Sequence, residues 1–179
     1  MYTEDTICAI ATAPGGALGI IRVSGTHTFE CLEKIFCPFG KQPLSERRNH
    51  EAVFGTIVSQ LPSGQMDTVD EVLVTIFRAP NSFTGEDSAE ISCHGSQYIL
   101  HRVIELLLES GCRMANPGEY TQRAFLNGKM DLSQAEAVAD VIASNSAASH
   151  RIAMSQMRGG IGRELNQLRE QLLHITSLL

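Results

Sequence analysis

Positive charge is scarce in this sequence. The 179 residues carry 14 lysines and arginines against 20 aspartates and glutamates, which gives a formal net charge of −6. A protein that binds nucleic acid by itself usually presents a basic face. The sequence shows no obvious face of this kind, so any contact with nucleic acid is expected to need another segment or a partner.

Long apolar runs and paired cysteines are also missing. The N-terminus is acidic and no long apolar run follows it, so neither a secretory signal nor a transmembrane span is expected and the cytoplasm is the default location. The cysteines are odd in number and form no CxxC pair, which predicts free thiols in a reducing compartment and no zinc site. They are Cys8, Cys31, Cys37, Cys93 and Cys112.

What is present suits an α+β protein of one or two domains. Hydrophobic residues make up 43% and charged residues 19%, as in a soluble globular chain. Alternation and short apolar runs predict strands over residues 6–12, 18–23, 53–58, 72–77 and 88–94, with the third and fourth paired as a hairpin. Three- and four-residue spacing predicts helices over 26–36 and 99–108.

The pattern changes near residue 119, after which everything looks helical. Asn116 and Pro117 suit a helix entry, and a capping box is predicted at Ser133–Glu136. A helical stripe runs from residue 147 to the end and is interrupted at Gly159 and Gly160. We therefore predict one domain over residues 1–118 and the start of a helical domain over 119–179. The stripe is still running at Leu179, which suggests a longer protein.

Three charged residues occupy unexpected places. Glu90 lies mid-strand on the polar face of residues 88–94, where it either faces solvent or is compensated. Arg22 interrupts an apolar run, so it either lies at a polar surface or is buried against an anion. Lys129 directly follows the helix break at Asn127–Gly128. Without further information it reads as a flexible loop lysine.

Several motifs, in chain order, resemble the bacterial tRNA-modification GTPase family MnmE, also called TrmE. They are DTICAIATAPG (5–15), GIIRVSG (19–25), PNSFTGED (80–87), CHG (93–95), NPGEYTQRAFLNGKMDL (116–132) and QAEA (134–137). The resemblance covers essentially the whole chain.

This resemblance implies a mixed-sheet N-terminal domain that binds tetrahydrofolate, similar to the glycine-cleavage aminomethyltransferase, and that also forms a homodimer. A helical domain follows, interrupted by an inserted GTPase domain. The family works in a heterotetramer with a flavin-dependent partner, MnmG (GidA). Together they add a carboxymethylaminomethyl group to carbon 5 of the wobble uridine of certain tRNAs. The one-carbon unit comes from a folate, and potassium stimulates GTP hydrolysis.

The sequence departs from the whole family protein in its missing motifs. It has no GxxxxGK[ST] loop, and the cluster at Gly159–Arg163 lacks the required lysine and hydroxyl. It also lacks the family's C-terminal Cys-x-Gly-Lys motif. The chain is therefore expected not to hydrolyse GTP and to carry no catalytic or metal-binding residue of its own. GTP, Mg²⁺ and K⁺ would act only through the missing GTPase domain.

The family's folate contacts map onto Arg22, Glu90 and Lys129. A carboxylate such as Glu90 can accept two N–H donors from a pterin, and the cations can pair with the anionic glutamate tail of 5-formyltetrahydrofolate or another tetrahydrofolate. A charge-assisted hydrogen bond contributes roughly 1.5–3 kcal/mol. Glu90→Ala is therefore expected to abolish measurable folate binding and to leave the dimer intact.

Two alternatives remain open. A stand-alone folate-dependent one-carbon transferase would need an acid or base, for which Glu90, His94 and Asp87 are the candidates. A purely structural dimerisation module would bind no folate. His94 is either a ligand contact or a polar residue that ends its strand, and Cys93 is expected to pack in the core.

Overall fold

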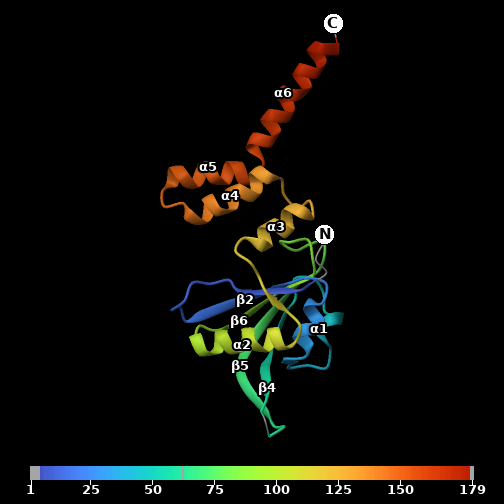
Figure 1. The fold of residues 1–179 in the computed structure, drawn as a ribbon, viewed down its shortest axis with the longest axis vertical. Coiled ribbons are helices and arrows are strands. Elements are labelled where there is room, and N and C mark those ends of the chain that lie inside the picture. Colours follow the sequence, from blue (N-terminus) through green and yellow to red (C-terminus); the bar gives the residue numbers. More distant parts are fainter. Residues whose placement is uncertain (1–4, 62, 178–179) are drawn as a thin grey trace. The chain divides into compact units, whose positions relative to one another are not determined.

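The computed structural model describes residues 5–61 and 63–177 (Figure 1). The chain divides into two compact units between Tyr120 and Thr121, close to the predicted boundary at residue 119. The first unit contains the strands and two helices, and the second is helical.

A seven-stranded sheet forms the first unit. Its spatial order is β3-β4-β5-β6-β2-β1-β7, and neighbouring strands are antiparallel except for β1 and β7. The predicted mixed-sheet α+β fold is therefore confirmed. The strands are β1 (Ile7–Ile10), β2 (Leu18–Ser24), β3 (Phe36–Pro38), β4 (Ala52–Gln60), β5 (Met66–Phe77), β6 (Ser88–His94) and β7 (Arg113–Met114).

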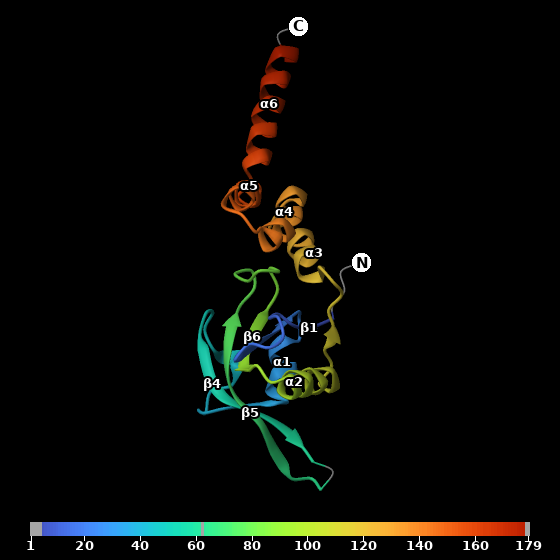
Figure 2. The ribbon, with the colours of Figure 1, turned by 90° about the vertical axis from the view of Figure 1, so that its left-hand side faces the viewer.

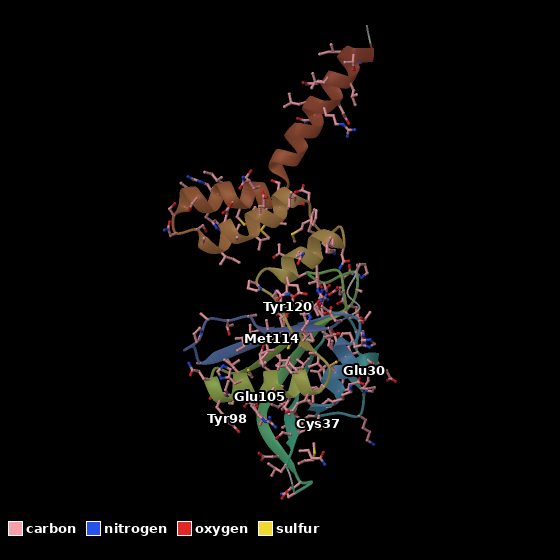
Figure 3. All side chains as sticks on the ribbon, in the orientation of Figure 1. Glu30, Cys37, Tyr98, Glu105, Met114 and Tyr120 are labelled. Atoms are coloured by element: carbon pink, nitrogen blue, oxygen red, sulfur yellow. The ribbon has the colours of Figure 1, made fainter. Side chains whose placement is uncertain are left out.

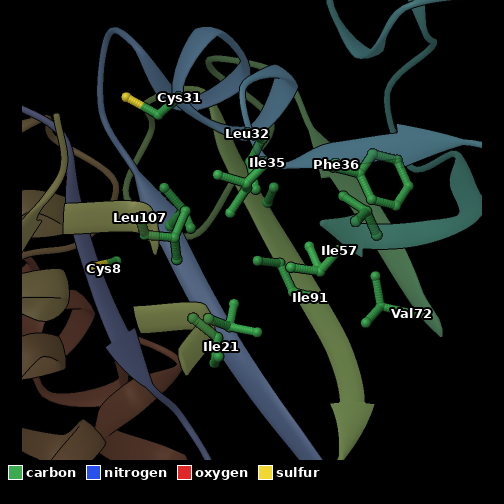
Figure 4. Packing of buried hydrophobic residues seen from close by; sticks show 14 of the residues in the cluster. Cys8, Ile21, Cys31, Leu32, Ile35, Phe36, Ile57, Val72, Ile91 and Leu107 are labelled. Atoms are coloured by element: carbon green, nitrogen blue, oxygen red, sulfur yellow. The ribbon is translucent and has the colours of Figure 1, made fainter. Parts of the chain in front are cut away.

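Helices α1 (Thr28–Glu33) and α2 (Gln97–Glu109) lie on one face of this sheet (Figure 2). The apolar stripe of α2 packs onto the inward side chains of the central strands. Ile21, Ile91 and Leu107 are fully buried in this core (Figure 4). The opposite face of the sheet carries the alternate side chains of the same strands, Glu90 and Arg22 among them.

The helix predicted over residues 26–36 is shorter than expected. It ends at Glu33, and Phe36 instead begins β3, where it pairs with Ile57. The spacing of the apolar residues does not reveal this change, because a helix and a following strand can bury the same residues against one core. Pro38 is tolerated because β3 is an edge strand. Sequence reasoning also missed the short β7 and the 3-10 turn at Leu44–Glu46.

The predicted hairpin is confirmed, since β4 and β5 pair along their length. Both strands are longer than predicted. The turn between them uses Gly64, whose φ is +82° and whose N–H donates to the carbonyl of Leu61. Pro62, part of the predicted turn, lies outside the described residues.

The predicted helix entry at Asn116 is shifted. Helix α3 (Glu119–Leu126) begins after Asn116 and Pro117, which therefore precede it. Glu119 still reaches back, because its Oε2 accepts the N–H of Asn116 at 2.7 Å. The N–H of Glu119 donates to the backbone carbonyl of Asn116 at 3.0 Å and not to its side chain, so among the described contacts only this half of the expected capping arrangement is formed.

The second unit continues with α4 (Leu132–Ala143), α5 (Ala147–Met157) and α6 (Gly160–Ser177). Helices α4 and α5 pack antiparallel (Figures 1 and 2). The predicted break is confirmed, since Gly159 has a φ of +73° between α5 and α6. No helix in the described ranges is both long and apolar enough to cross a membrane.

The residue that caps α4 is Asp131, not Ser133 as predicted. Asp131 Oδ1 accepts the N–H of Gln134 at 2.8 Å, and Gln134 Oε1 accepts the N–H of Asp131 at 2.9 Å. Asp131 has the extended backbone that a cap needs, whereas Ser133 already lies in the first turn. Both residues fit the sequence pattern of a capping box, so the pattern alone could not separate them.

Candidate ligand-binding site

Two of the three predicted site residues are direct partners across the sheet. Strands β2 and β6 are antiparallel neighbours, and their register pairs Arg22 with Glu90. On β6, Ala89, Ile91 and Cys93 point into the core, so the intervening Glu90 points to the opposite face. Arg22 reaches that face in the same way, between the buried Ile21 and Val23.

Arg22 and Glu90 form a half-buried ion pair. Nε and Nη2 of Arg22 both donate to Glu90 Oε1, at 2.9 and 2.6 Å. Their side chains are 32% and 26% exposed. The alternative in which each is compensated by an opposite charge is therefore the one observed. Within the described parts of the chain, Glu90 Oε2 and Arg22 Nη1 make no hydrogen bond or ion pair.

Aromatic rings flank the guanidinium of Arg22. The ring centroids of Phe83 and Tyr120 each lie 5.6 Å from its central carbon, within the range of a cation–π contact. The hydroxyl of Tyr120 (labelled in Figure 3) also donates to the backbone carbonyl of Arg22 at 2.7 Å. The two rings restrict the positions available to Arg22 and give the site apolar walls.

Arg22 borders a larger and a smaller hollow. The larger has a volume of about 360 Å³, within the usual range for small-molecule sites. Besides Arg22, its lining comprises Ala9, Ile10, Ala11, Ala115, Asn116, Pro117, Gly118 and Tyr120. The smaller, on the Glu90 side, has a volume of about 60 Å³ and is lined by Arg22, Phe77, Phe83, Thr84, Ser88 and Glu90. That volume suits about two water molecules, not a fused ring system.

A buried hydroxyl cluster holds the loop that carries Phe83. Ser24 Oγ lies 2.7 Å from Thr84 Oγ1 and donates to Glu86 Oε2 at 2.8 Å, while Ser88 Oγ donates to Ser24 Oγ at 2.9 Å. Buried polar groups that are hydrogen-bonded to one another fix their segment firmly. The loop after β5 therefore presents Phe83 on an anchored backbone.

A charged network holds the other wall. Arg113 donates to both carboxylate oxygens of Glu119, at 2.6 and 2.9 Å, and to Asp5 Oδ2 at 2.7 Å. The side-chain hydrogen bonds from Arg113 to Glu119 and Asp5 raise the pKa of its guanidinium. Since Glu119 also accepts the N–H of Asn116, the network ties the Asn116–Gly118 wall to β7.

His94 is held at the end of β6 by a buried carboxylate. Its Nδ1 lies 2.7 Å from Asp70 Oδ1, and its backbone N–H donates to Asp70 Oδ2 at 2.9 Å. A β-carbon on the following Gly95 would lie 1.9 Å from the carbonyl oxygen of Gly16, so only glycine fits there. The observed contacts of His94 are those of a residue that ends a strand.

Cys93 and Asp87 both make contacts that hold the fold together. Cys93 is buried in the core, as predicted, and burial raises the pKa of its thiol to about 11. Asp87 Oδ1 accepts the N–H of Ala79 at 2.9 Å, and its Oδ2 lies 3.7 Å from Arg78 Nη1. These contacts hold the loop before β6.

Lys129 lies in the second unit, in the exposed turn after α3. Gly128, with a φ of +69°, makes this turn, and the N–H of Lys129 donates to the carbonyl of Ala124. The predicted folate contacts of Lys129, Arg22 and Glu90 stay predictions. Within the described residues, no group of three or more His, Cys, Asp or Glu side chains could hold a metal ion.

Sequence reasoning missed Phe83, Tyr120 and Asp70. Phe83 and Tyr120 lie inside two of the family motifs, but no local pattern shows that two aromatic residues so far apart in the chain lie near one arginine. Asp70 could have been noticed as an acidic residue beside the apolar run of β5.

Comparisons with known proteins place the chain in a family. Residues 6–129 match the family model described as GTP-binding protein TrmE N-terminus, and residues 132–179 match the MnmE helical domain. A tRNA modification GTPase MnmE of Bacteroides thetaiotaomicron is 62% identical, over 98% of this chain and 37% of its own length.

Two further relatives with the same name show a similar coverage. That of Phocaeicola vulgatus is 56% identical over 100% of this chain and 41% of its own length. That of Flavobacterium johnsoniae is 52% identical over 100% of this chain and 38% of its own length. The chain thus spans about two fifths of the length of these relatives, and it belongs to the MnmE (TrmE) family of tRNA modification GTPases.

Proposed function

We propose that this chain is the folate-binding and dimerising part of a tRNA-modification GTPase, and that the Arg22–Glu90 pair is the centre of its folate site. The observation that carries the proposal is the pair itself. Within the described residues, Glu90 Oε2 and Arg22 Nη1 keep one acceptor and one donor without a hydrogen-bond or ion-pair partner, and two aromatic rings lie near the guanidinium.

Glu90 is the pterin contact in this proposal. Its Oε1 is held by Arg22, which orients the carboxylate, while Oε2 can accept an N–H from the pterin edge. The ring edge of a pterin also offers a carbonyl oxygen, which suits the remaining donor of Arg22. Lys129 is proposed to pair with the anionic glutamate tail of the folate. Arg22 would also pair with this tail if the tail extends as far as Arg22.

The larger hollow is the proposed place for the body of the ligand. Its volume of about 360 Å³ is adequate for part of a folate, and its Asn116–Gly118 wall is held by the Glu119 network described above. The hollow on the Glu90 side is too small for a pterin. Because the volume on the Glu90 side is too small, we propose that a second subunit completes the site. This agrees with the homodimer that the family resemblance implies.

The remaining family properties are proposed for the whole protein. They are GTP hydrolysis with Mg²⁺ and K⁺, assembly with MnmG, and modification of the wobble uridine of tRNA in the cytoplasm. The relatives' names support tRNA modification and the GTPase activity. We propose that this chain contributes folate binding and dimerisation, and that the GTP-binding loop, whose motif its sequence lacks, is supplied by another part of the protein.

Titration of 5-formyltetrahydrofolate into the purified chain, followed by calorimetry, tests the proposal. Glu90→Ala is expected to weaken binding by at least about tenfold, because a lost charge-assisted hydrogen bond exceeds the 1.4 kcal/mol that corresponds to one decade. Light scattering is expected to show the same dimer for the wild type and the variant.

The matched control is Glu71→Ala. Glu71 is exposed on β5 and faces the same side of the sheet as Glu90, so its loss removes one charge without touching the pair. Folate affinity that Glu90→Ala leaves unchanged, or that Glu71→Ala lowers equally, would contradict the assignment.

A further inference from the structure

The negative charge of the chain is unevenly divided between its units. Residues 1–120 carry 15 acidic and 8 basic side chains, whereas residues 121–179 carry 5 acidic and 6 basic ones. Residues 141–163 contain three arginines and one histidine but no aspartate or glutamate. The net charge of −6 therefore conceals a segment of the second unit that is purely basic.

Helix α5 gathers part of this charge on one face. His150 and Met154 lie four residues apart on this face, Arg151 and Ser155 form the adjacent row, and Arg158 follows at the C-cap, one residue past the end of the helix. These five side chains line a surface hollow of about 400 Å³. All of them except Met154 are exposed.

The packing of α5 against α4 fixes the direction of this face. Ala153, the buried residue of α5, is only 3% exposed. The C-terminal end of α5 is tied to the start of α4, because Gln134 Nε2 donates to the carbonyl of Met157 at 2.9 Å. Arg151, two residues before Ala153 and therefore on the other side of the helix, consequently points away from α4.

We propose that this face of α5, the basic face formed by His150, Arg151, Met154, Ser155 and Arg158, binds the phosphate backbone of tRNA. The inference rests on the proposed function, because tRNA enters through the names of the relatives. The inference names the surface of this chain that contacts tRNA, which the family match does not assign.

The chemistry of the basic face suits a ribose-phosphate backbone. A guanidinium presents its donors as a fork that pairs with phosphate oxygens, and a serine hydroxyl adds a neutral donor. The rise of an α-helix separates the Cα atoms of Arg151 and Arg158 by about 10 Å, so the two side chains can reach different phosphates. Residues 141–163 themselves contain no carboxylate, so the face carries no acidic residue of its own.

Fluorescence anisotropy with a labelled, unmodified tRNA transcript and the 179-residue chain tests this surface. The double variant Arg151→Gln/Arg158→Gln is expected to bind at least tenfold more weakly at low salt. The slope of log K against log salt should fall by one to two, since each lost phosphate contact removes about 0.7–0.9. Lysine at both positions should restore most of the slope, because a point charge still pairs with phosphate.

Arg169→Gln is the matched control, since Arg169 is an exposed arginine on α6 of the same unit. It is expected to leave the affinity and the slope unchanged. Circular dichroism checks that the double variant stays helical, and Arg151→Gln alone, in mid-helix, should give about half of the slope change.

Three results would overturn the inference. They are the absence of tRNA binding by the wild-type chain, a double variant with unchanged slope, and an equal loss in Arg169→Gln. If the double variant instead loses binding to polyglutamate while tRNA binding persists, the basic face serves an acidic protein partner.

Failure of this inference is distinguishable from failure of the folate proposal. The double variant should bind 5-formyltetrahydrofolate like the wild type, and Glu90→Ala should bind tRNA like the wild type. A chain that binds no folate but shows the predicted slope change would refute the folate site and leave the RNA surface standing. A chain that binds folate as proposed but shows no change in the salt slope would refute the RNA surface and leave the folate site standing.

Discussion

The guanidinium of Arg22 meets groups from three separate parts of the chain: the carboxylate of Glu90 and the rings of Phe83 and Tyr120. An arginine in an apolar strand is costly unless its charge is satisfied. These contacts supply one opposite charge and two ring faces. Strand β2 can therefore keep a cation beside the core in a fixed orientation.

Tyr120 is the residue whose removal tests this arrangement most finely. Tyr120→Phe keeps the ring over Arg22 but deletes the hydroxyl that donates to the carbonyl of Arg22. The free energy of unfolding of the first unit is expected to fall by about 0.5–1.5 kcal/mol, the contribution of one hydrogen bond. Hydrogen exchange of the β2 amides, recorded at increasing urea concentrations, measures this change in the free energy of unfolding.

The control for that variant is Tyr98→Phe, because Tyr98 is 73% exposed on α2. It is expected to change stability by less than about 0.5 kcal/mol. Equal effects of the two variants would show that the hydroxyl of Tyr120 has no structural role.

Thiol reactivity gives a second test at the residue scale. Cys37 is exposed, whereas Cys8, Cys31, Cys93 and Cys112 are buried. Because the thiolate is the reactive form, the raised pKa of Cys93 protects it further. The native chain is therefore expected to show one fast-reacting thiol with Ellman's reagent, which Cys37→Ser removes, and all five in denaturant. A second fast thiol in the native state would contradict the described burial.

At the scale of the elements, the capping of α4 shows where pattern reasoning ends. Two overlapping tetrads, one beginning at Asp131 and one at Ser133, fit the same rule. The structure chooses the first, and Gln134 then serves twice: it closes the capping box and donates to the end of α5. The choice therefore depends on packing between helices as well as on local geometry.

Asp131→Ala is expected to destabilise the second unit by about 1 kcal/mol, because it leaves a helix N–H without its acceptor. Ser133→Ala is the matched control and should change stability little, since alanine is a good helix former inside the first turn. Thermal unfolding followed by far-UV circular dichroism compares them. A larger loss in Ser133→Ala would reverse the assignment of the cap.

At the scale of the whole molecule, the division into two units separates the consequences of mutation. Ile91 is fully buried at the centre of the sheet core (Figure 4). Ile91→Ala is expected to lower the stability of the first unit by about 2–5 kcal/mol through the cavity that it leaves. Hydrogen exchange should accelerate in β2 and β6.

Ile142→Ala supplies the contrast, because Ile142 is 81% exposed in the second unit. Its effect is expected to stay within about 0.5 kcal/mol. Unaltered exchange in β6 after Ile91→Ala would show that this residue does not belong to the cooperative core.

The division into units also qualifies the argument from net charge. A whole-chain value of −6 suggested no basic face, yet it averages an acidic sheet unit with a helical unit that has one more basic than acidic residue. Charge steers partners locally, over about a Debye length, so the value for each unit is the more useful one. The tRNA titration decides whether the expectation drawn from the whole chain holds.

Much of the fold could be predicted from local patterns. An apolar run located β2, alternation located β6, a turn between two apolar runs located the β4–β5 hairpin, and a three-four stripe located α2. These predictions succeeded because each element buries one face and its period is set by its own backbone geometry. The shortened α1 and the missed β3 failed because helix and strand can bury the same short run of apolar residues.

The sequence by itself determined most of the helices and strands, the free thiols, the family motifs and the unusual placement of Arg22 and Glu90. Only the tertiary structure decided that these two residues, 68 positions apart, are partners, and that Phe83 and Tyr120 flank the arginine. The physical reason is that periodicity is a local property. Which strand lies beside which, and in what register, depends on how all the buried faces fit together in one core.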